Sequence, residues 1–292
     1  MPFQTAAFAA FTAPARARPA LWRLILGLML IVGIYAAVVI AAFSFAPFLP
    51  NDMAWRGTTP LSMSLMMGSF AGVVFGVFIA VRLLHARAPA TLFGPPARVV
   101  RDFGLALGVF AVAQGLNLCL WAWVYDATPV HGLDHVLTWL PWAVLLVLVQ
   151  TGAEELVFRG YILQQLAARF RNPVIWFACP PVLFAALHWD PVTNGALNGL
   201  VVVMIGVTGL AWADITRISG SIGGSWGWGW HFANNAFLMI VLGNMGQMDA
   251  FASHATPYAI TDMPLLPVMA DLVTQIAIWL VLRRLLRRDA RN

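Results

Sequence analysis

The sequence predicts an all-α, polytopic membrane protein with about eight transmembrane helices. Of its 292 residues, 61% are hydrophobic and only 10% are charged, and the mean hydropathy is +0.80. A soluble chain cannot bury so much apolar surface while so few charges remain for its exterior. Soluble enzymes and secreted domains are therefore excluded.

The expected helices are apolar runs long enough to cross about 30 Å of hydrocarbon, at about 1.5 Å per helical residue. These runs lie at 24–48, 61–84, 103–125, 137–158, 174–189, 195–215, 226–243 and 264–282. The first run is too long for the apolar part of a cleaved signal peptide, so we expect it to remain as a span.

The runs divide the chain into four parts. Residues 1–20 are rich in alanine and contain no acidic residue, which is typical of a disordered cytoplasmic arm. Residues 21–136 form the N-terminal transmembrane helices, and 137–245 form a core that carries the candidate chemistry. Residues 246–292 provide the last span and an arginine-rich cytoplasmic tail.

Arginine placement predicts the orientation. The net charge of +5 comes from 17 arginines, with no lysine, against 12 acidic residues. Cytoplasmic loops carry an excess of such residues, and a cytoplasmic N-terminus places every arginine except Arg56 on that side. We expect both termini in the cytoplasm of a bacterium, with the chain passing repeatedly through the inner-membrane bilayer. The arginines are scattered between apolar runs, so no nucleic-acid partner is expected.

Glu154 and Glu155 are the two glutamates of the whole chain, and they lie side by side in an apolar helix. A carboxylate within a span is costly unless it is paired or lines a wet cavity. Glu155 has a structural explanation, since Arg159 lies four residues further on the same helix face. Glu154 points about 100° away and has no basic residue three or four positions from it. It is therefore the candidate functional carboxylate.

Two histidines lie within or beside apolar runs. His188 ends the run Phe184–His188, and His231 begins the segment that contains Asn235. Residues four apart share a helix face, so His231 and Asn235 should point the same way. Each histidine alone has a structural explanation as a hydrogen-bonded core residue. Together with Glu154 they supply a base, a polarising group and donors, which peptide-bond hydrolysis requires.

These motifs, in this order, resemble the three-motif signature of the CAAX-processing and bacteriocin-processing family of intramembrane proteases, also called the Abi family. The matching residues are Glu154-Glu155-x-x-x-Arg159, Phe184-x-x-x-His188 and His231-x-x-x-Asn235. Phe158-Arg159-Gly160 also matches the family wording, and the resemblance covers about residues 140–245.

The resemblance implies roles for these residues. Glu154 would activate a water as general base, and His188 would orient or polarise that water. His231 and Asn235 would stabilise the oxyanion, while Glu155, Arg159 and Phe184 support the site. The implied substrate is a membrane-embedded or lipid-associated peptide or protein. No cofactor is required by this mechanism; the alternative is a zinc ion held by Glu154, His188 and His231.

Other interpretations stay open at this level. A member of the family can act as a silent scaffold or immunity protein, and a proton-coupled transporter also places ionisable residues in its spans. The substrate and the oligomeric state do not follow from the sequence. The Gly- and Trp-rich segment 220–230 is interpreted as an interfacial tryptophan belt whose glycines allow close helix packing.

The predicted topology also poses a problem of depth. His188 falls near the far end of its span, whereas His231 begins its span near the cytoplasmic side. The two can meet if Pro180-Pro181 breaks the fifth span, or if the helix carrying Glu154 is long and tilted, from about 137 to 170.

Overall fold

The computed structural model describes residues 4–44, 56–121, 127–222, 226–258 and 260–289. These residues form mainly helices, as the predicted all-α fold class requires, and three short strands, which it does not include. The longer helices and the strands are α1 (Ala6–Thr12), α2 (Leu21–Phe43), α3 (Pro60–Gly68), α4 (Phe70–His85), α5 (Pro96–Trp121), β1 (Thr128–Pro129), α6 (Leu133–Glu155), α7 (Leu163–Arg169), α8 (Cys179–Ala186), α9 (Pro191–Asn194), α10 (Asn198–Ser219), α11 (Trp226–Ala236), β2 (Leu242–Asn244), β3 (His254–Thr256) and α12 (Leu265–Asp289).

Three π-helical segments and four 3₁₀ segments complete the described secondary structure. The π segments are Leu156–Ile162 between α6 and α7, Val174–Ala178 before α8 and Phe237–Val241 after α11. The 3₁₀ segments are Ala13–Ala17, Pro89–Leu92, Gly195–Leu197 and Ile260–Asp262.

Six helical segments are long and apolar enough to cross a membrane, so length and composition do not establish the predicted count of eight. They are Leu21–Phe43, Pro60–His85, Pro96–Cys119, Leu133–Arg169, Pro191–Ser219 and Leu265–Arg287. The predicted spans 174–189 and 226–243 correspond to shorter helices. The first is the apolar helix Val174–Ala186, and the second leaves helical geometry after Val241, where β2 begins.

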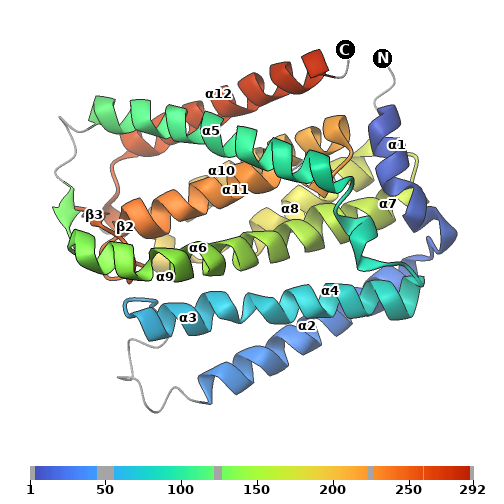
Figure 1. Cartoon of the computed structure of the whole chain (residues 1–292), viewed down its shortest axis with the longest axis horizontal. Helices are drawn as coiled ribbons and strands as arrows, with labels where there is room; N and C mark the ends of the chain where they lie inside the picture. Colours follow the sequence, from blue (N-terminus) through green and yellow to red (C-terminus); the bar gives the residue numbers. More distant parts are fainter. Residues whose placement is uncertain (1–3, 45–55, 122–126, 223–225, 259, 290–292) are drawn as a thin grey trace.

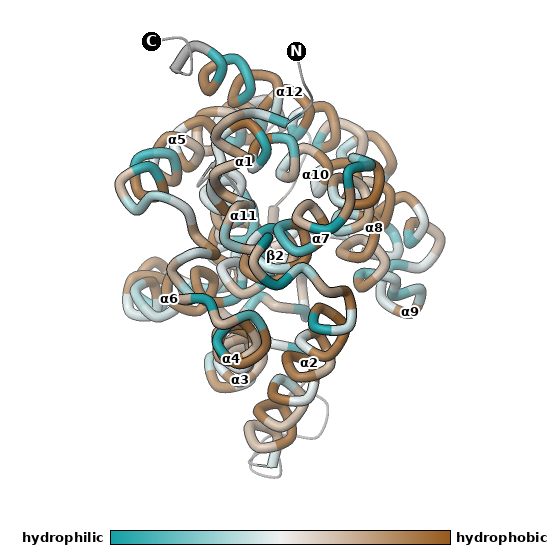
Figure 2. Tube along the Cα trace, turned by 90° about the vertical axis from the view of Figure 1, so that its right-hand side faces the viewer, coloured by the Kyte–Doolittle hydropathy of each residue, from teal (hydrophilic) through white to brown (hydrophobic). Residues whose placement is uncertain are grey.

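The long helices run alongside one another, and both chain ends lie at the same end of the bundle (Figure 1). The strands lie at the opposite end, where β3 pairs antiparallel with β1 and parallel with β2. Hydrophobic residues predominate along the helices when the bundle is viewed from its terminal end (Figure 2). Large apolar side chains such as Met29, Leu83 and Val273 are more than 60% exposed. Such a surface suits lipid rather than water.

Residues 4–20 of the N-terminal arm are ordered, which corrects the prediction of disorder for them. Thr5 caps α1 by accepting a hydrogen bond from the Phe8 backbone N–H, and its hydroxyl donates to the carbonyl of Arg217. Phe8 is fully buried and stacks on Trp176, with ring centroids 4.8 Å apart. The arm therefore folds because residues far along the chain provide an apolar contact for it.

Trp228 and Trp230 of segment 220–230 do not form an interfacial belt. Trp230 is fully buried and donates to the Gln275 side chain at 2.7 Å, and Trp228 packs edge-on against Phe103. The glycines do allow close packing, as predicted. A Cβ atom on Gly229 would lie 2.4 Å from the carbonyl oxygen of Phe103. The side chain of Trp226 falls outside the described residues.

Candidate active site

A π-helical segment begins directly after the paired glutamates. Glu155 is the last residue of α6, and Leu156–Ile162 then follow a wider helical path before α7 resumes. The other two motif helices also carry a π segment, one just before α8 and one just after α11. Such segments are rare in proteins and are frequent at functional sites, because they change which side chains face a helix partner.

Glu155 is fully buried and holds two basic groups, as its predicted pairing with Arg159 requires. Its Oε1 atom lies 3.1 Å from Arg159 Nη1 and 3.0 Å from His231 Nδ1. Arg159 Nη2 donates further to the carbonyl of Gly209 at 3.3 Å. Glu155 therefore ties α6, α10 and α11 together at one point.

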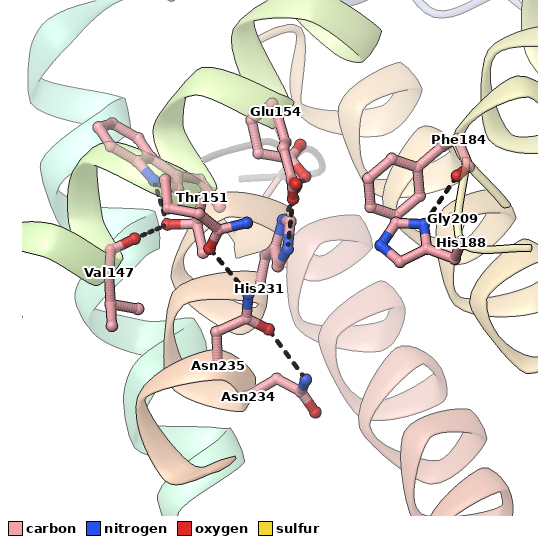
Figure 3. Close-up of polar contacts among 12 residues, drawn as sticks. Val147, Thr151, Glu154, Phe184, His188, Gly209, His231, Asn234 and Asn235 are labelled. Atoms are coloured by element: carbon pink, nitrogen blue, oxygen red, sulfur yellow. Dashed lines mark hydrogen bonds and ion pairs between the residues drawn. The ribbon is translucent and has the colours of Figure 1, made fainter. Parts of the chain in front are cut away.

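Glu154 has a partner that its own helix does not reveal. Its Oε2 atom lies 3.2 Å from Nε2 of His231, and its side chain keeps 15% of its surface exposed (Figure 3). The sequence correctly indicates that no basic residue of the same helix pairs with it. The partner comes instead from α11, 77 positions along the chain.

His231 is fixed by contacts on its edges and on its face. Its two ring nitrogens face Glu155 and Glu154, and Trp212 of α10 stacks on the ring with centroids 4.2 Å apart. Trp212 also lies beneath the guanidinium of Arg159, at 5.0 Å. The imidazole is thus held between two carboxylates with little freedom to turn.

His188 lies in the same site as His231, because both line one cavity although the predicted spans would separate them. Its Nδ1 atom donates to the carbonyl of Phe184 at 2.9 Å, which leaves Nε2 as the acceptor nitrogen of the neutral ring. The Phe184 ring contacts both histidines, with centroids 4.8 Å from His188 and 6.0 Å from His231. Figure 3 shows His188 across from His231 and Glu154.

The structure bears differently on the two explanations considered for this meeting. Pro180 and Pro181 lie in the first turn of α8 and do not break the apolar helix Val174–Ala186, and His188 lies two residues beyond its end. The helix that carries Glu154 is long and continues from Leu133 to Arg169.

Asn235 lies one helical turn beyond His231 on α11, as their spacing predicts. Its amide nitrogen donates to Gln150 Oε1 at 2.9 Å, and its amide oxygen accepts from Asn234 at 3.2 Å. These contacts orient the amide, and one N–H of the group remains for another acceptor.

The site opens onto a cavity of about 1040 Å³. Glu154, His188, His231 and Asn235 all line it, together with Phe184. Apolar side chains of α10, such as Val201 and Met204, cover another wall. The cavity thus has the size and the mixed lining of a ligand-binding site.

The residues present do not fit a zinc ion in this arrangement. Across the part of the chain that is described, no group of three or more His, Cys, Asp or Glu side chains is arranged to hold a metal. Glu154, His188 and His231 all line the cavity, but both nitrogens of His231 face carboxylates. A histidine ligand must offer a ring nitrogen to the metal. A metalloprotease assignment thus has no support from the geometry.

Sequence reasoning missed two contributors to the site. Gln150 lies one turn before Glu154 on the same helix face, so its polar side chain in an apolar run was a usable signal. Trp212 gave no signal, because a tryptophan in an apolar run ordinarily packs in a core or at an interface. Its stacking on His231 depends on how α10 and α11 meet.

Comparisons with known proteins agree with this site. Residues 136–237 match the family model described as type II CAAX prenyl endopeptidase Rce1-like. A relative from Bacillus subtilis (strain 168), named Uncharacterized protein YyaK, is 28% identical over 249 residues, which cover 80% of this chain and 81% of the relative. No solved structure matches the chain. All the motif residues lie inside the matched range, so the predicted resemblance is confirmed: residues 136–237 of this chain are similar to the Rce1-like type II CAAX prenyl endopeptidase family.

Proposed function

We propose that this protein is an intramembrane endopeptidase that hydrolyses a peptide bond by means of a water activated by Glu154. The observation that carries the proposal is the joint lining of one cavity by a carboxylate, two histidines and an amide. A protease-like enzyme is supported at the level of the family. The substrate we propose is a membrane-embedded or lipid-associated peptide or protein.

Glu154 is the proposed general base because it is the glutamate with access to the cavity. It takes one proton of the water as the oxygen attacks the carbonyl carbon of the scissile bond. His188 accepts a hydrogen bond from the same water through Nε2, since Nδ1 already donates to Phe184. When the tetrahedral intermediate collapses, Glu154 returns the proton to the leaving amine nitrogen.

His231 and Asn235 are the proposed oxyanion donors. Asn235 retains one amide N–H beyond its bond to Gln150. The geometry adds a condition for His231, because its Nε2 atom faces Glu154. The substrate oxygen must therefore take the place of the Glu154 carboxylate at this N–H when that oxygen becomes charged. Preorganised donors of this kind commonly supply the largest part of such a rate enhancement.

Charge balance favours a protonated His231. Glu154 and Glu155 are two negative groups, and Arg159 neutralises one of them. An imidazolium donates to both carboxylates at once and brings the sum of the four charges to zero, whereas a neutral ring donates to only one. A neutral set costs less in a low-dielectric interior than a set with net charge.

We propose the bacterial inner membrane as the location, with eight passes and both termini in the cytoplasm. Both chain ends lie at the same end of the bundle (Figure 1), which supports an even number of passes. The multi-pass character follows from six long apolar helices. Reporter fusions after Arg87, Arg171 and Arg217 should report the cytoplasmic side. A periplasmic signal at any of them would contradict this orientation.

Hydrolysis by purified protein with and without Glu154 tests the proposed function. Peptides from a digested membrane proteome are incubated with the protein in lipid nanodiscs, and new termini are identified by mass spectrometry. We expect products that are absent with Glu154→Gln. A scaffold or immunity protein gives no products with either protein, and a proton-coupled transporter instead acidifies proteoliposomes when its solute is supplied.

A further inference from the structure

One carboxylate inside the membrane-spanning helices lies outside the matched domain and has no cationic partner. Asp271 belongs to α12, within the span Leu265–Arg287, and it lines the same cavity as Glu154. Its hydrogen bond to Gln275 Nε2 measures 3.4 Å, at the weak end of the range. Within the described residues no arginine or histidine lies at ion-pair distance from it.

Apart from Asp134, which is exposed in the first turn of α6, the other described carboxylates inside the spans have such a partner. The pairs are Asp102 with Arg101, Glu154 with His231, Glu155 with Arg159, and Asp214 with Arg217 and Arg283. An acidic residue in a span ordinarily pairs with a basic group or marks the path of a ligand. Asp271 departs from the pattern of this protein, and the space it faces is the cavity.

The residues around Asp271 form their shorter hydrogen bonds with one another rather than with its carboxylate. Gln275 Oε1 accepts from Trp230 at 2.7 Å, and Gln275 Nε2 donates to Asn234 Oδ1 at 3.0 Å, a shorter contact than its contact with Asp271. Asn234 in turn donates to Asn235 (Figure 3). A row of amides therefore joins the catalytic face of α11 to α12, and Asp271 keeps acceptor capacity for a group that enters the cavity.

The helix register places Asp271 close to the scissile bond. Gln275 contacts Trp230 and Asn234, which flank His231 on α11. Asp271 lies one turn from Gln275, about 6 Å along α12, toward the end of the bundle that holds the strands. A peptide whose scissile bond lies at Glu154 and His231 can thus place a nearby side chain against Asp271, since an extended chain advances about 3.3 Å per residue.

We propose that Asp271 binds a cationic side chain, the ammonium of lysine or the guanidinium of arginine, on the peptide that occupies this cavity. The inference rests on the proposed function insofar as that peptide is the substrate, and it then defines the substrate class as peptides with a basic residue near the scissile bond. The apolar wall of α10 contacts the other side chains of the peptide, and Asp271 makes the cavity selective for a basic one.

A binding measurement tests this without turnover. The probe is a short N-acylated peptide amide with one lysine, compared with a twin in which norleucine replaces the lysine. Both are titrated against full-length Glu154→Gln protein in nanodiscs, where Asp271 is the remaining carboxylate among the described cavity-lining residues. We expect the lysine peptide to bind at least ten-fold more tightly. Adding Asp271→Asn, which preserves the size of the side chain, should make the two affinities equal.

Two further variants control the experiment. Asp271→Glu keeps the charge and should retain a preference for lysine. Asp134→Asn removes an exposed carboxylate at the start of α6, outside the cavity, and should leave the preference unchanged. Equal affinities in the Glu154→Gln protein, a preference that survives Asp271→Asn, or no binding of either peptide would each overturn the proposal. Hydrolysis lost with Glu154→Gln is read separately, so a failure of the proposed function remains distinguishable.

Discussion

Two buried charge clusters in this bundle use the same kinds of residue but differ in access to the cavity. In one, His231 joins Glu154 to Glu155, and both His231 and Glu154 line the cavity. In the other, Asp214 lies 2.5 Å from Arg217 Nη2, 3.3 Å from Arg283 Nε and 3.2 Å from Trp279 Nε1. None of the described residues that line the cavity belongs to this second cluster.

Burial and pairing do not by themselves distinguish the proposed catalytic carboxylate, Glu154, from the structural carboxylate, Asp214. Asp214 is surrounded by donors from α10 and α12, so its ion pairs hold the two helices together. Glu154 keeps 15% of its side chain exposed and faces space for a water and a substrate. Replacing Glu154 by glutamine should therefore affect mainly the rate of hydrolysis, and replacing Asp214 by asparagine should affect mainly the stability of the fold.

The largest expected effect is the loss of activity with Glu154→Gln. The amide cannot accept a proton from water, so hydrolysis should fall about 10³-fold or more while the melting temperature changes little. Asp214→Asn should do the opposite, with a lower melting temperature and nearly unchanged activity per folded molecule. Hydrolysis rates and thermal unfolding of the two purified variants give the comparison. Matching losses of both properties in both variants would remove the distinction between the clusters.

Within the first cluster, Arg159→Ala should act mainly on stability. It leaves Glu155 buried without its guanidinium partner, and breaking such a pair costs roughly 3–5 kcal/mol. Arg169→Ala, in the last turn of α7, is the matched control and should cost little, because Arg169 forms no ion pair within the described residues. Denaturant unfolding in detergent measures both. An Arg159→Ala protein as stable as the control would mean that Arg159 does not brace the site.

Asn235→Ala should reduce turnover by about 10²–10³ with little change in substrate binding, because an oxyanion donor acts mainly in the transition state. Asn234→Ala removes the group that orients the Asn235 amide and should have a smaller effect. The measurement is kcat and KM for a peptide identified by the hydrolysis screen. A rise in KM at constant kcat would assign Asn235 to ground-state binding instead.

The sequence predicts the membrane fold well because a long apolar run has few alternatives to a spanning helix. It predicts two helix ends poorly, at 174–189 and 226–243, because π segments and the strand after Val241 depend on neighbouring helices. The ordered arm is missed for a similar reason, since Phe8 is stabilised by Trp176 rather than by local sequence.

The candidate site divides in the same way. Spacing within one helix correctly predicts the pair of Glu155 with Arg159 and the shared face of His231 and Asn235. Residue spacing within one helix does not determine contacts between helices. The contact of Glu154 with His231 and the stacking of Trp212 on His231 therefore could not be predicted from the sequence. The roles of the motif residues in catalysis stay predictions.

The smallest expected effect concerns metal removal, which we expect to leave activity unchanged. His231 directs both ring nitrogens at carboxylates, and His188 uses one nitrogen for a backbone carbonyl, so three of the four ring nitrogens already have a hydrogen-bond partner. Active protein is treated with a chelator, its metal content is determined by elemental analysis, and hydrolysis is measured before and after. Zinc that is present at one equivalent, leaves together with activity and restores activity on return would contradict the proposed mechanism. In that case His231 would have to release a carboxylate to bind the ion, and the His231→Gln protein would lose metal and activity together. If His231 is instead an oxyanion donor, the glutamine side chain still offers an N–H, and the His231→Gln protein should keep part of its activity.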